Sequence, residues 1–210
     1  MAIYWKDLSI PLKPGMTMWP GDTPFAMEPD GRISRGDNCN TSVLTVPTHT
    51  GTHCDAPWHF EDDGKRLHEV DKQLFFGMAR LIDVGDEVDL IESHHLGEAP
   101  LPERVLIKSR NSQGAPNRPF DTNYVPLSEG AAERLVYDGV RLVGVDYLSV
   151  APYKQSAPVH HILLQQEVFI VEGLCLGELA PGDYPFTVLP LALIGADGSP
   201  CRAFAGIERL

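Results

Sequence analysis

The sequence predicts a mixed α/β fold in which β-strands outnumber helices. The chain has 210 residues, enough for one domain with a hydrophobic core and too few for two of usual size. Forty-three per cent of the residues are hydrophobic and 22% are charged, as in globular proteins. The 19 glycines and 18 prolines are spread along the chain, which indicates many turns between short elements. We therefore expect one compact domain over residues 1–210.

Short apolar runs bounded by turn residues predict the strands. They cover Ser42–Val46, Ala79–Val84, Arg104–Ile107, Val140–Val145, Val168–Val171 and Thr187–Leu193. The run at 140–145 is almost continuously apolar, which is typical of a strand covered on both faces.

One helix is predicted between Ser128 and Gly139. Ser128 can cap its N-terminus and Gly139 can end it. The apolar residues between them share one helical face: Ala131, Ala132, Leu135 and Val136. A second, shorter helix is expected over Leu67–Phe75.

Charge and cysteine content narrow the class of protein. The 17 Lys and Arg against 29 Asp and Glu give a formal charge of −12, which disfavours nucleic acid and anionic membranes as partners. The N-terminal residues lack a signal-peptide pattern, and the apolar stretch Val188–Ala196 is shorter than the roughly 20 residues of a membrane helix. The four cysteines form no C-x-x-C pair; reduced thiols in a cytoplasmic protein are expected, with two long-range disulfides left open.

The most informative segment is Thr48–Phe60. His49, His53, Asp55 and His59 are separated by even numbers of residues. Side chains alternate along an extended chain, so these four are expected on one face. Imidazoles with a carboxylate are a donor set that zinc or manganese accepts. The alternative is a solvated polar strand face, which would explain one histidine more easily than three.

Neighbouring residues refine this prediction. Gly51 and Pro57 argue against a helix in the segment. Cys54 has the opposite parity and is not expected among the ligands.

Further along the chain, Glu172 ends an apolar run that follows the pair His160 and His161. A buried carboxylate needs a cation or several hydrogen-bond donors. An exposed strand end, or pairing with a basic residue, explains Glu172 equally well, and one of the two histidines is expected only to pack or cap. The residues alone leave this group undecided.

Other catalytic motifs are weak. Residues 173–177 (GLCLG) match a nucleophile elbow with Cys175 in place of serine, but no histidine follows Cys175, as that fold requires. The chain contains neither a P-loop nor a G-x-G-x-x-G motif.

Residues 49–60 (HTGTHCDAPWHF) resemble the H-x-G-T-H-x-D-x-P-x-H-F signature of the metal-dependent cyclase-like hydrolases, and within them the bacterial kynurenine formamidases. The resemblance extends over nearly the whole chain: Trp19–Phe25, Gly139–Asp146, the histidine pair with Glu172, and Leu189 to Arg202. It implies a single compact β-rich domain of the swivelling β/β/α type that assembles into a homodimer or homotetramer.

The resemblance also implies a site with two divalent metal ions, Zn²⁺ or Mn²⁺. His49, His53 and Asp55 would hold the first, with Asp55 bridging to the second. His160 and Glu172 would complete the second, because their spacing of twelve matches the family and that of His161 does not.

The implied activity is hydrolysis of N-formyl-kynurenine to kynurenine and formate, in tryptophan catabolism. His59 would be the general acid/base, and Trp19 would line the pocket for a small aromatic amide.

One segment departs from the family. After Asp146 the formamidases are expected to read Thr-Pro-Ser-x-Asp-Pro, whereas this chain reads Tyr147–Pro152 (YLSVAP). A cyclic amide or imide such as isatin is therefore an alternative substrate. A non-catalytic metal-binding domain is a second alternative, which His59 disfavours because a histidine beyond the ligand set suits proton transfer.

Overall fold

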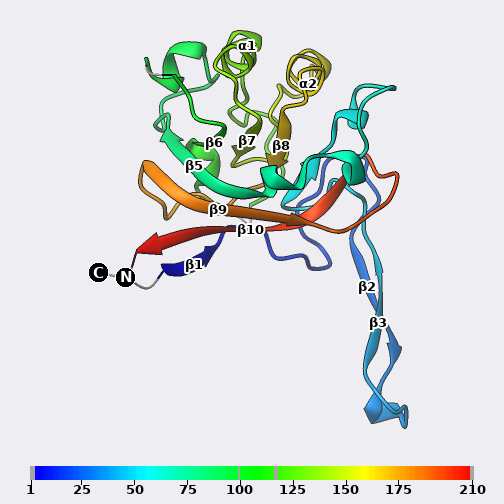
Figure 1. Cartoon of the computed structure of the whole chain (residues 1–210). Helices are drawn as coiled ribbons and strands as arrows, with labels where there is room; N and C mark the ends of the chain where they lie inside the picture. The colour runs from blue at the N-terminus through cyan, green and yellow to red at the C-terminus, as the bar shows by residue number, and fades with distance from the viewer. Residues whose placement is uncertain (1–2, 99, 116–117, 209–210) are drawn as a thin grey trace.

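A computed structural model describes residues 3–98, 100–115 and 118–208 (Figure 1). The strands are β1 Ile3–Asp7, β2 Ala26–Gly31, β3 Thr41–Thr45, β4 His53–Asp55, β5 Phe76–Asp83, β6 Arg104–Lys108, β7 Leu142–Val145, β8 Phe169–Glu172, β9 Gly182–Pro190 and β10 Gly198–Glu208. The α-helices are α1 Glu129–Tyr137 and α2 Ala157–Leu164, and short 3₁₀ turns lie between several strands.

Seven strands close into a barrel in the order β10-β4-β8-β7-β6-β5-β9. Strands β5 to β8 form its parallel part, whereas β4, β9 and β10 pair antiparallel to their neighbours. The long β10 closes the barrel because residues 198–200 pair with β4 and residues 201–205 pair with β9. Strand β1 adds to the outside of β10.

Alternation along the strands separates two apolar layers. Each barrel strand contributes to the interior: Cys54, Leu81, Leu106, Leu142, Phe169, Phe186 and Ala203. On β6, Val105 and Ile107 point the other way, toward the helices, while Leu106 points inward. The same alternation places Cys54 of β4 inside the barrel, so the two residues that flank it face outward.

Helices α1 and α2 lie side by side over the outer face of β6, β7 and β8 (Figure 1). The predicted helix is confirmed: the Ser128 hydroxyl accepts a hydrogen bond from Ala131 N–H, and the buried side chains of α1 face the strands. The apolar run at 140–145 is confirmed as a strand, β7, buried along its whole length.

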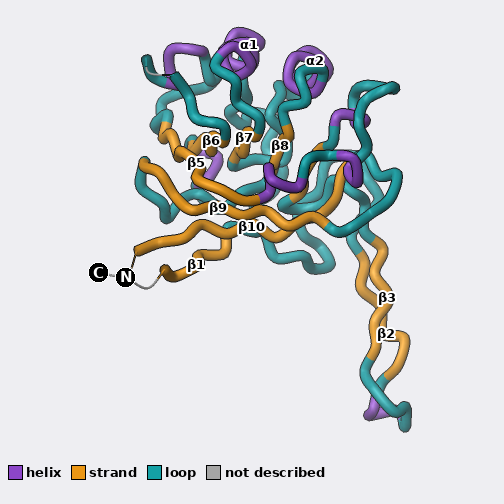
Figure 2. Tube along the Cα trace, viewed as in Figure 1, coloured by secondary structure: helices purple, strands orange, loops and turns teal. Residues whose placement is uncertain are grey.

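A two-stranded hairpin extends away from the barrel. It consists of β2 and β3 with the turn between them, residues 26–45, and we call it the arm (Figure 2). It forms a sheet of its own, separate from the barrel sheet. Large apolar side chains are exposed along it: Met27, Ile33, Val43 and Leu44.

One predicted element is wrong and another is displaced along the chain. Leu67–Phe75 is not a continuous helix but two 3₁₀ turns, Leu67–Glu69 and Lys72–Phe75. The chain is extended at Val70 and Asp71, and the Asp71 carboxylate caps the second turn by accepting from Gln73 N–H. The strand expected over Thr187–Leu193 begins at Gly182, where it pairs with β5, and ends at Pro190.

All four cysteines are free. Within the described residues, no helix has the length and apolar character needed to cross a membrane.

Candidate metal centre

Two adjacent strands place three of the predicted site residues on the outer face of the barrel. His53 and Asp55 of β4 share the face opposite Cys54, as their parity predicts. Glu172 of β8 lies directly across the antiparallel pairing from His53, with 3.1 Å between His53 Nε2 and Glu172 Oε2. All three side chains are almost completely buried.

His49 reaches the same place by a different route from the one expected. The strand covers only His53–Asp55, and the chain turns at Gly51, which has a φ of +63°. The His49 ring packs against the start of β10, where a Cβ at Gly198 would come within 2.8 Å of His49 Cε1. Glycine at 198 therefore lets the ring lie with Nδ1 2.8 Å from Asp55 Oδ1.

Helix α2 contributes one of its two histidines. His160 is buried, with Nε2 3.5 Å from Glu172 Oε1 and 3.8 Å from Asp55 Oδ2. His161 points elsewhere, and its Nδ1 lies 2.5 Å from Glu61 Oε1. The structure thus brings His160 to the site and leaves His161 outside it.

Two groups of donor atoms share Asp55, and His49 also belongs to a third, less buried group with His59 and Asp197. His49, His53 and Asp55 make the first, and Asp55, His160 and Glu172 make the second; within each, the donor atoms lie within 4.8 Å of one another. Asp55 Oδ2 is buried and finds no hydrogen-bond partner among the described residues. A buried carboxylate oxygen without a donor is costly unless a cation neutralises it, so the donor set fits divalent metal ions.

Hydrogen bonds to backbone carbonyls fix which ring nitrogen of His53 and of His160 faces the carboxylates. His53 Nδ1 donates to the Gly51 carbonyl at 3.0 Å, and His160 Nδ1 donates to the Ser156 carbonyl at 2.7 Å. A carbonyl oxygen can only accept, so Nε2 of both rings is left to face the site.

The carboxylates favour positive charge in this pocket. Burial opposes protonation of His49, but the carboxylates of Asp55 and Asp197 raise its pKa to about 10. Burial also opposes ionisation of Asp55, yet the facing histidines hold its pKa below the usual range. The same attraction between opposite charges acts on a bound metal cation.

His59 belongs to neither of the two groups that share Asp55, but forms the third group with His49 and Asp197. It ends the 3₁₀ turn Pro57–His59, so its direction comes from that turn and not from the strand alternation. Its ring stacks on His49, with centroids 3.9 Å apart and planes at 26°. Burial lowers the pKa of His59. This places a titratable imidazole next to the donor cluster.

A cavity of about 230 Å³ opens onto the cluster. Its wall includes His49, His53, His59, His160 and Glu172, together with Trp19, Leu148 and Ser149. Trp19 packs edge-on against Phe120, with ring centroids 5.1 Å apart. The Tyr147–Pro152 segment, which departs from the expected pattern, thus reaches the cavity through Leu148 and Ser149.

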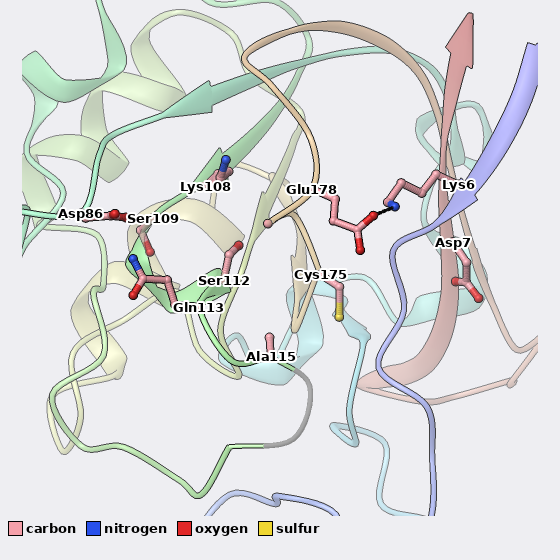
Figure 3. Close-up of a pocket in the computed structure, with 11 residues that line it drawn as sticks. Lys6, Asp7, Asp86, Lys108, Ser109, Ser112, Gln113, Ala115, Cys175 and Glu178 are labelled. Carbon is pink, nitrogen blue, oxygen red and sulfur yellow. Dashed lines mark hydrogen bonds and ion pairs between the residues drawn. The ribbon is translucent and has the colours of Figure 1, made fainter. Parts of the chain in front are cut away.

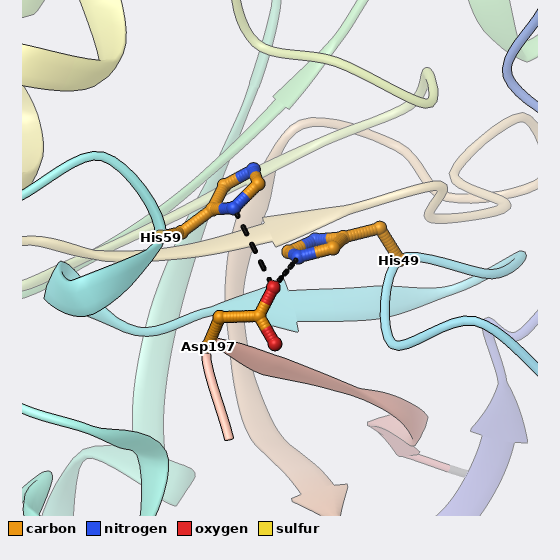
Figure 4. Close-up of side chains that lie close together, drawn as sticks. All are labelled: His49, His59 and Asp197. Carbon is orange, nitrogen blue, oxygen red and sulfur yellow. Dashed lines mark hydrogen bonds and ion pairs between the residues drawn. The ribbon is translucent and has the colours of Figure 1, made fainter. Parts of the chain in front are cut away.

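The sequence did not point to Asp197. Asp197 Oδ2 lies 2.8 Å from His49 Nε2 and 3.7 Å from His59 Nδ1 (Figure 4). It comes almost 140 residues after the histidine segment, at the end of the connection between β9 and β10, and no spacing motif connects the two.

The two cysteines considered earlier lie outside the site. Cys54 faces the barrel interior. Cys175 lines a separate cavity of about 510 Å³ near the ion pair of Lys6 and Glu178 (Figure 3). Burial raises the pKa of the Cys175 thiol to about 11, which is opposite to the activation that a nucleophile needs.

Known proteins with the same fold and sequence pattern place this site in a family. Residues 6–152 match the family described as "Putative cyclase". A kynurenine formamidase of Bacillus cereus is 40% identical over 205 residues, covering 95% of each chain. A solved structure named as a potential metal-dependent hydrolase with cyclase activity is 26% identical, with a TM-score of 0.85 and full coverage of both chains.

An isatin hydrolase A from Labrenzia aggregata shares the fold, with a TM-score of 0.83 at 20% identity, over 99% of this chain and 94% of that one. A closed, β-rich barrel with a histidine–carboxylate cluster on its outer face defines a metal-dependent hydrolase. The chain belongs to the cyclase family.

Proposed function

We propose that the protein is an arylformamidase that hydrolyses N-formyl-kynurenine to kynurenine and formate. The observation that carries the proposal is the buried donor cluster at the floor of a cavity with Trp19 in its wall. The identity to kynurenine formamidases over most of the chain supports the same substrate class, a small aromatic amide.

We further propose two divalent metal ions per chain, zinc or manganese. His49, His53 and Asp55 would hold one, and Asp55, His160 and Glu172 the other. The buried, unpartnered Asp55 Oδ2 supports a shared carboxylate. When bound, such ions supply an activated water and polarise the scissile carbonyl.

The chain's own residues supply the remaining steps. The indole of Trp19 lies in the cavity wall and offers an aromatic surface for the ring of the substrate. His59 Nδ1 faces Asp197, and the other ring nitrogen, Nε2, points away from it (Figure 4). His59 Nε2 would donate the proton that the departing aniline-type nitrogen needs.

Kinetics on a small panel of substrates test the activity. N-formyl-kynurenine, formanilide, a simple lactam and isatin are compared at equal metal content, measured on the same samples. We expect the highest kcat/KM for N-formyl-kynurenine and a lower value for formanilide. A protein that is fully loaded with metal and hydrolyses none of the formamides would contradict the proposal.

Isatin is the second candidate because of one segment. Tyr147–Pro152 lacks the threonine, the first proline and the acid expected of the formamidases, and its Leu148 and Ser149 line the cavity. A kcat/KM for isatin above that for N-formyl-kynurenine would favour this cyclic amide.

We propose a homo-oligomer, a dimer or tetramer, in which the arm packs on a second copy. A two-stranded hairpin on its own is only marginally stable in water, yet the arm extends from the barrel with Met27 and Val43 exposed. An apolar hollow of about 570 Å³ at its base includes Leu44, Leu189 and Leu191. Because both surfaces belong to one chain, a two-fold axis can pair them reciprocally.

Light scattering after gel filtration tests this assembly. Met27→Asp with Val43→Asp should shift the mass toward the monomer, whereas Tyr137→Asp on the exposed end of α1 should not. A monomeric wild-type protein would contradict the proposal.

A cytoplasmic location stays a prediction from the sequence.

A further inference from the structure

Asp197 is held in place by the closure of the barrel. Its backbone carbonyl accepts a hydrogen bond from Ala56 N–H at 2.8 Å, and the next residue, Gly198, pairs with Asp55. The main chain at Asp197 is therefore tied to β4, directly beside the carboxylate shared by the two donor groups.

One oxygen of this carboxylate faces three polar groups. Asp197 Oδ2 lies 2.8 Å from His49 Nε2 and 3.7 Å from His59 Nδ1 (Figure 4). It also accepts a hydrogen bond from Thr48 Oγ1 at 3.4 Å. A carboxylate at neutral pH only accepts, so His49 Nε2 carries the hydrogen of its bond to Asp197.

The three histidines of the two groups that share Asp55 differ in how their outward nitrogen is satisfied. His53 and His160 donate Nδ1–H to backbone carbonyls and present Nε2 to the site. His49 is turned round, with Nδ1 toward Asp55 and Nε2 toward Asp197. His49 thus differs from His53 and His160, because its outward nitrogen faces a carboxylate and theirs face backbone carbonyls. Such a partner fixes the orientation of a ligating histidine and increases its basicity.

We propose that Asp197 is a positioning residue that holds His49 with Nδ1 toward the metal site and keeps His59 stacked on the His49 ring. The inference rests on the proposed metal-dependent hydrolysis for its kinetic consequence, but its effect on metal binding needs no substrate. Without the carboxylate, the His49 ring can rotate about its side-chain bonds, and His59 loses the negative charge 3.7 Å from its Nδ1.

The test measures zinc affinity by competition with a chromophoric chelator. Asp197→Ala should lower the affinity for one of the bound zinc ions by roughly 10–100-fold, the usual cost of removing the partner of a ligating histidine. Asp197→Asn keeps an acceptor oxygen and should lose less. Asp183→Ala is the matched control, because Asp183 pairs with Arg80 on β9 and β5, which carry none of the proposed ligands. Circular dichroism establishes that each variant is folded.

Steady-state kinetics on formanilide supply the second readout. Asp197→Ala at saturating zinc should lower kcat with little change in KM, because His59 is no longer held. Zinc affinity and kcat equal to those of the wild type would overturn the inference. If Asp197→Ala lacked one zinc ion even at saturating zinc, Asp197 would be a ligand, and the positioning role would be overturned as well. If the wild type binds zinc but hydrolyses no formamide, the proposed function fails while the zinc titration still decides the role of Asp197.

Discussion

Glu172 and His53 face each other across neighbouring strands, with 3.1 Å between Glu172 Oε2 and His53 Nε2. Because the backbone pairing of β4 and β8 sets this distance, Glu172→Gln should change the charge of the site without moving its backbone. A neutral amide binds a divalent cation more weakly than a carboxylate does. We expect the metal content to fall from two ions toward one per chain, measured by elemental analysis. Two retained ions and a normal rate would assign Glu172 a purely structural role.

The adjacent histidines of α2 should differ in the same assay. His160→Ala removes a buried donor of the second group, so metal stoichiometry should again approach one. His161→Ala is the matched control on the next residue, and it should leave the stoichiometry near two because His161 contacts Glu61 instead. The reverse pattern would show that the wrong member of the pair had been assigned to the site.

Removal of the metal should abolish hydrolysis and destabilise the fold. Dialysis against a strong chelator should stop formamide hydrolysis, and added zinc or manganese should restore it. Ions that bind only the folded chain stabilise it by about 2.7 kcal/mol at 100 times Kd, which is roughly 5–10 °C in Tm for a domain of this size. Calorimetry with and without chelator measures the shift. Full activity of demonstrably metal-free protein would rule out the mechanism.

His59→Ala should keep the metal ions and the fold but lose roughly 10²–10⁴-fold in kcat, the usual contribution of a positioned proton donor. The loss should be greatest for amides with poor leaving groups, which depend most on protonation of the nitrogen. An activated ester of similar shape should retain much of its rate. Equal losses on amide and ester would remove the general-acid role, and loss of an ion would make His59 a ligand.

Asp146 gives the fold a pH dependence of its own. It is buried, and burial raises its pKa to about 6, although Ser109 and Ser112 donate hydrogen bonds to it. Since the folded pKa exceeds the usual 3.8, the folded chain binds the proton more tightly. The resulting stabilisation is complete below about pH 3.8 and is lost as the pH rises through about 6.

Urea unfolding at pH 4.5 and pH 7, with chelator throughout, measures this effect. Between these pH values the wild type should lose more stability than Asp146→Asn, by about 2 kcal/mol, because at pH 4.5 the carboxyl of the unfolded chain is already largely ionised. Parallel changes in the two proteins would show that Asp146 is not the titrating group.

The elements predicted best from the sequence are those whose own residues form a local apolar pattern. The parallel strands β6, β7 and β8 are continuous apolar runs and were found within two residues of their ends. Strand β10 was missed because Pro200 and Arg202 interrupt its apolar pattern, and it forms through pairing with strands far away in the sequence. Helix α2 was missed because it has eight residues and no capping hydrogen bond from the side chain of Ser156.

The candidate site shows the same division. Alternation along a strand correctly placed His53 and Asp55 together and Cys54 opposite them. It could not place His49 and His59, which lie on a turn and a 3₁₀ turn outside the strand. Asp197 could not be found at all, because its approach to His49 depends on the closure of the barrel by β10.

The three-residue strand β4 has consequences for when the site can form during protein synthesis. A nascent chain that has emerged only as far as β8 already carries His53, Asp55 and Glu172, but it lacks Gly198–Pro200, the segment that pairs with the other edge of β4. Because domains generally fold as units, we expect the ligands to assemble only after about residue 200 has left the exit tunnel. Metal capture should therefore follow the synthesis of β10, and a translation product truncated before Gly198 should bind divalent metal ions poorly.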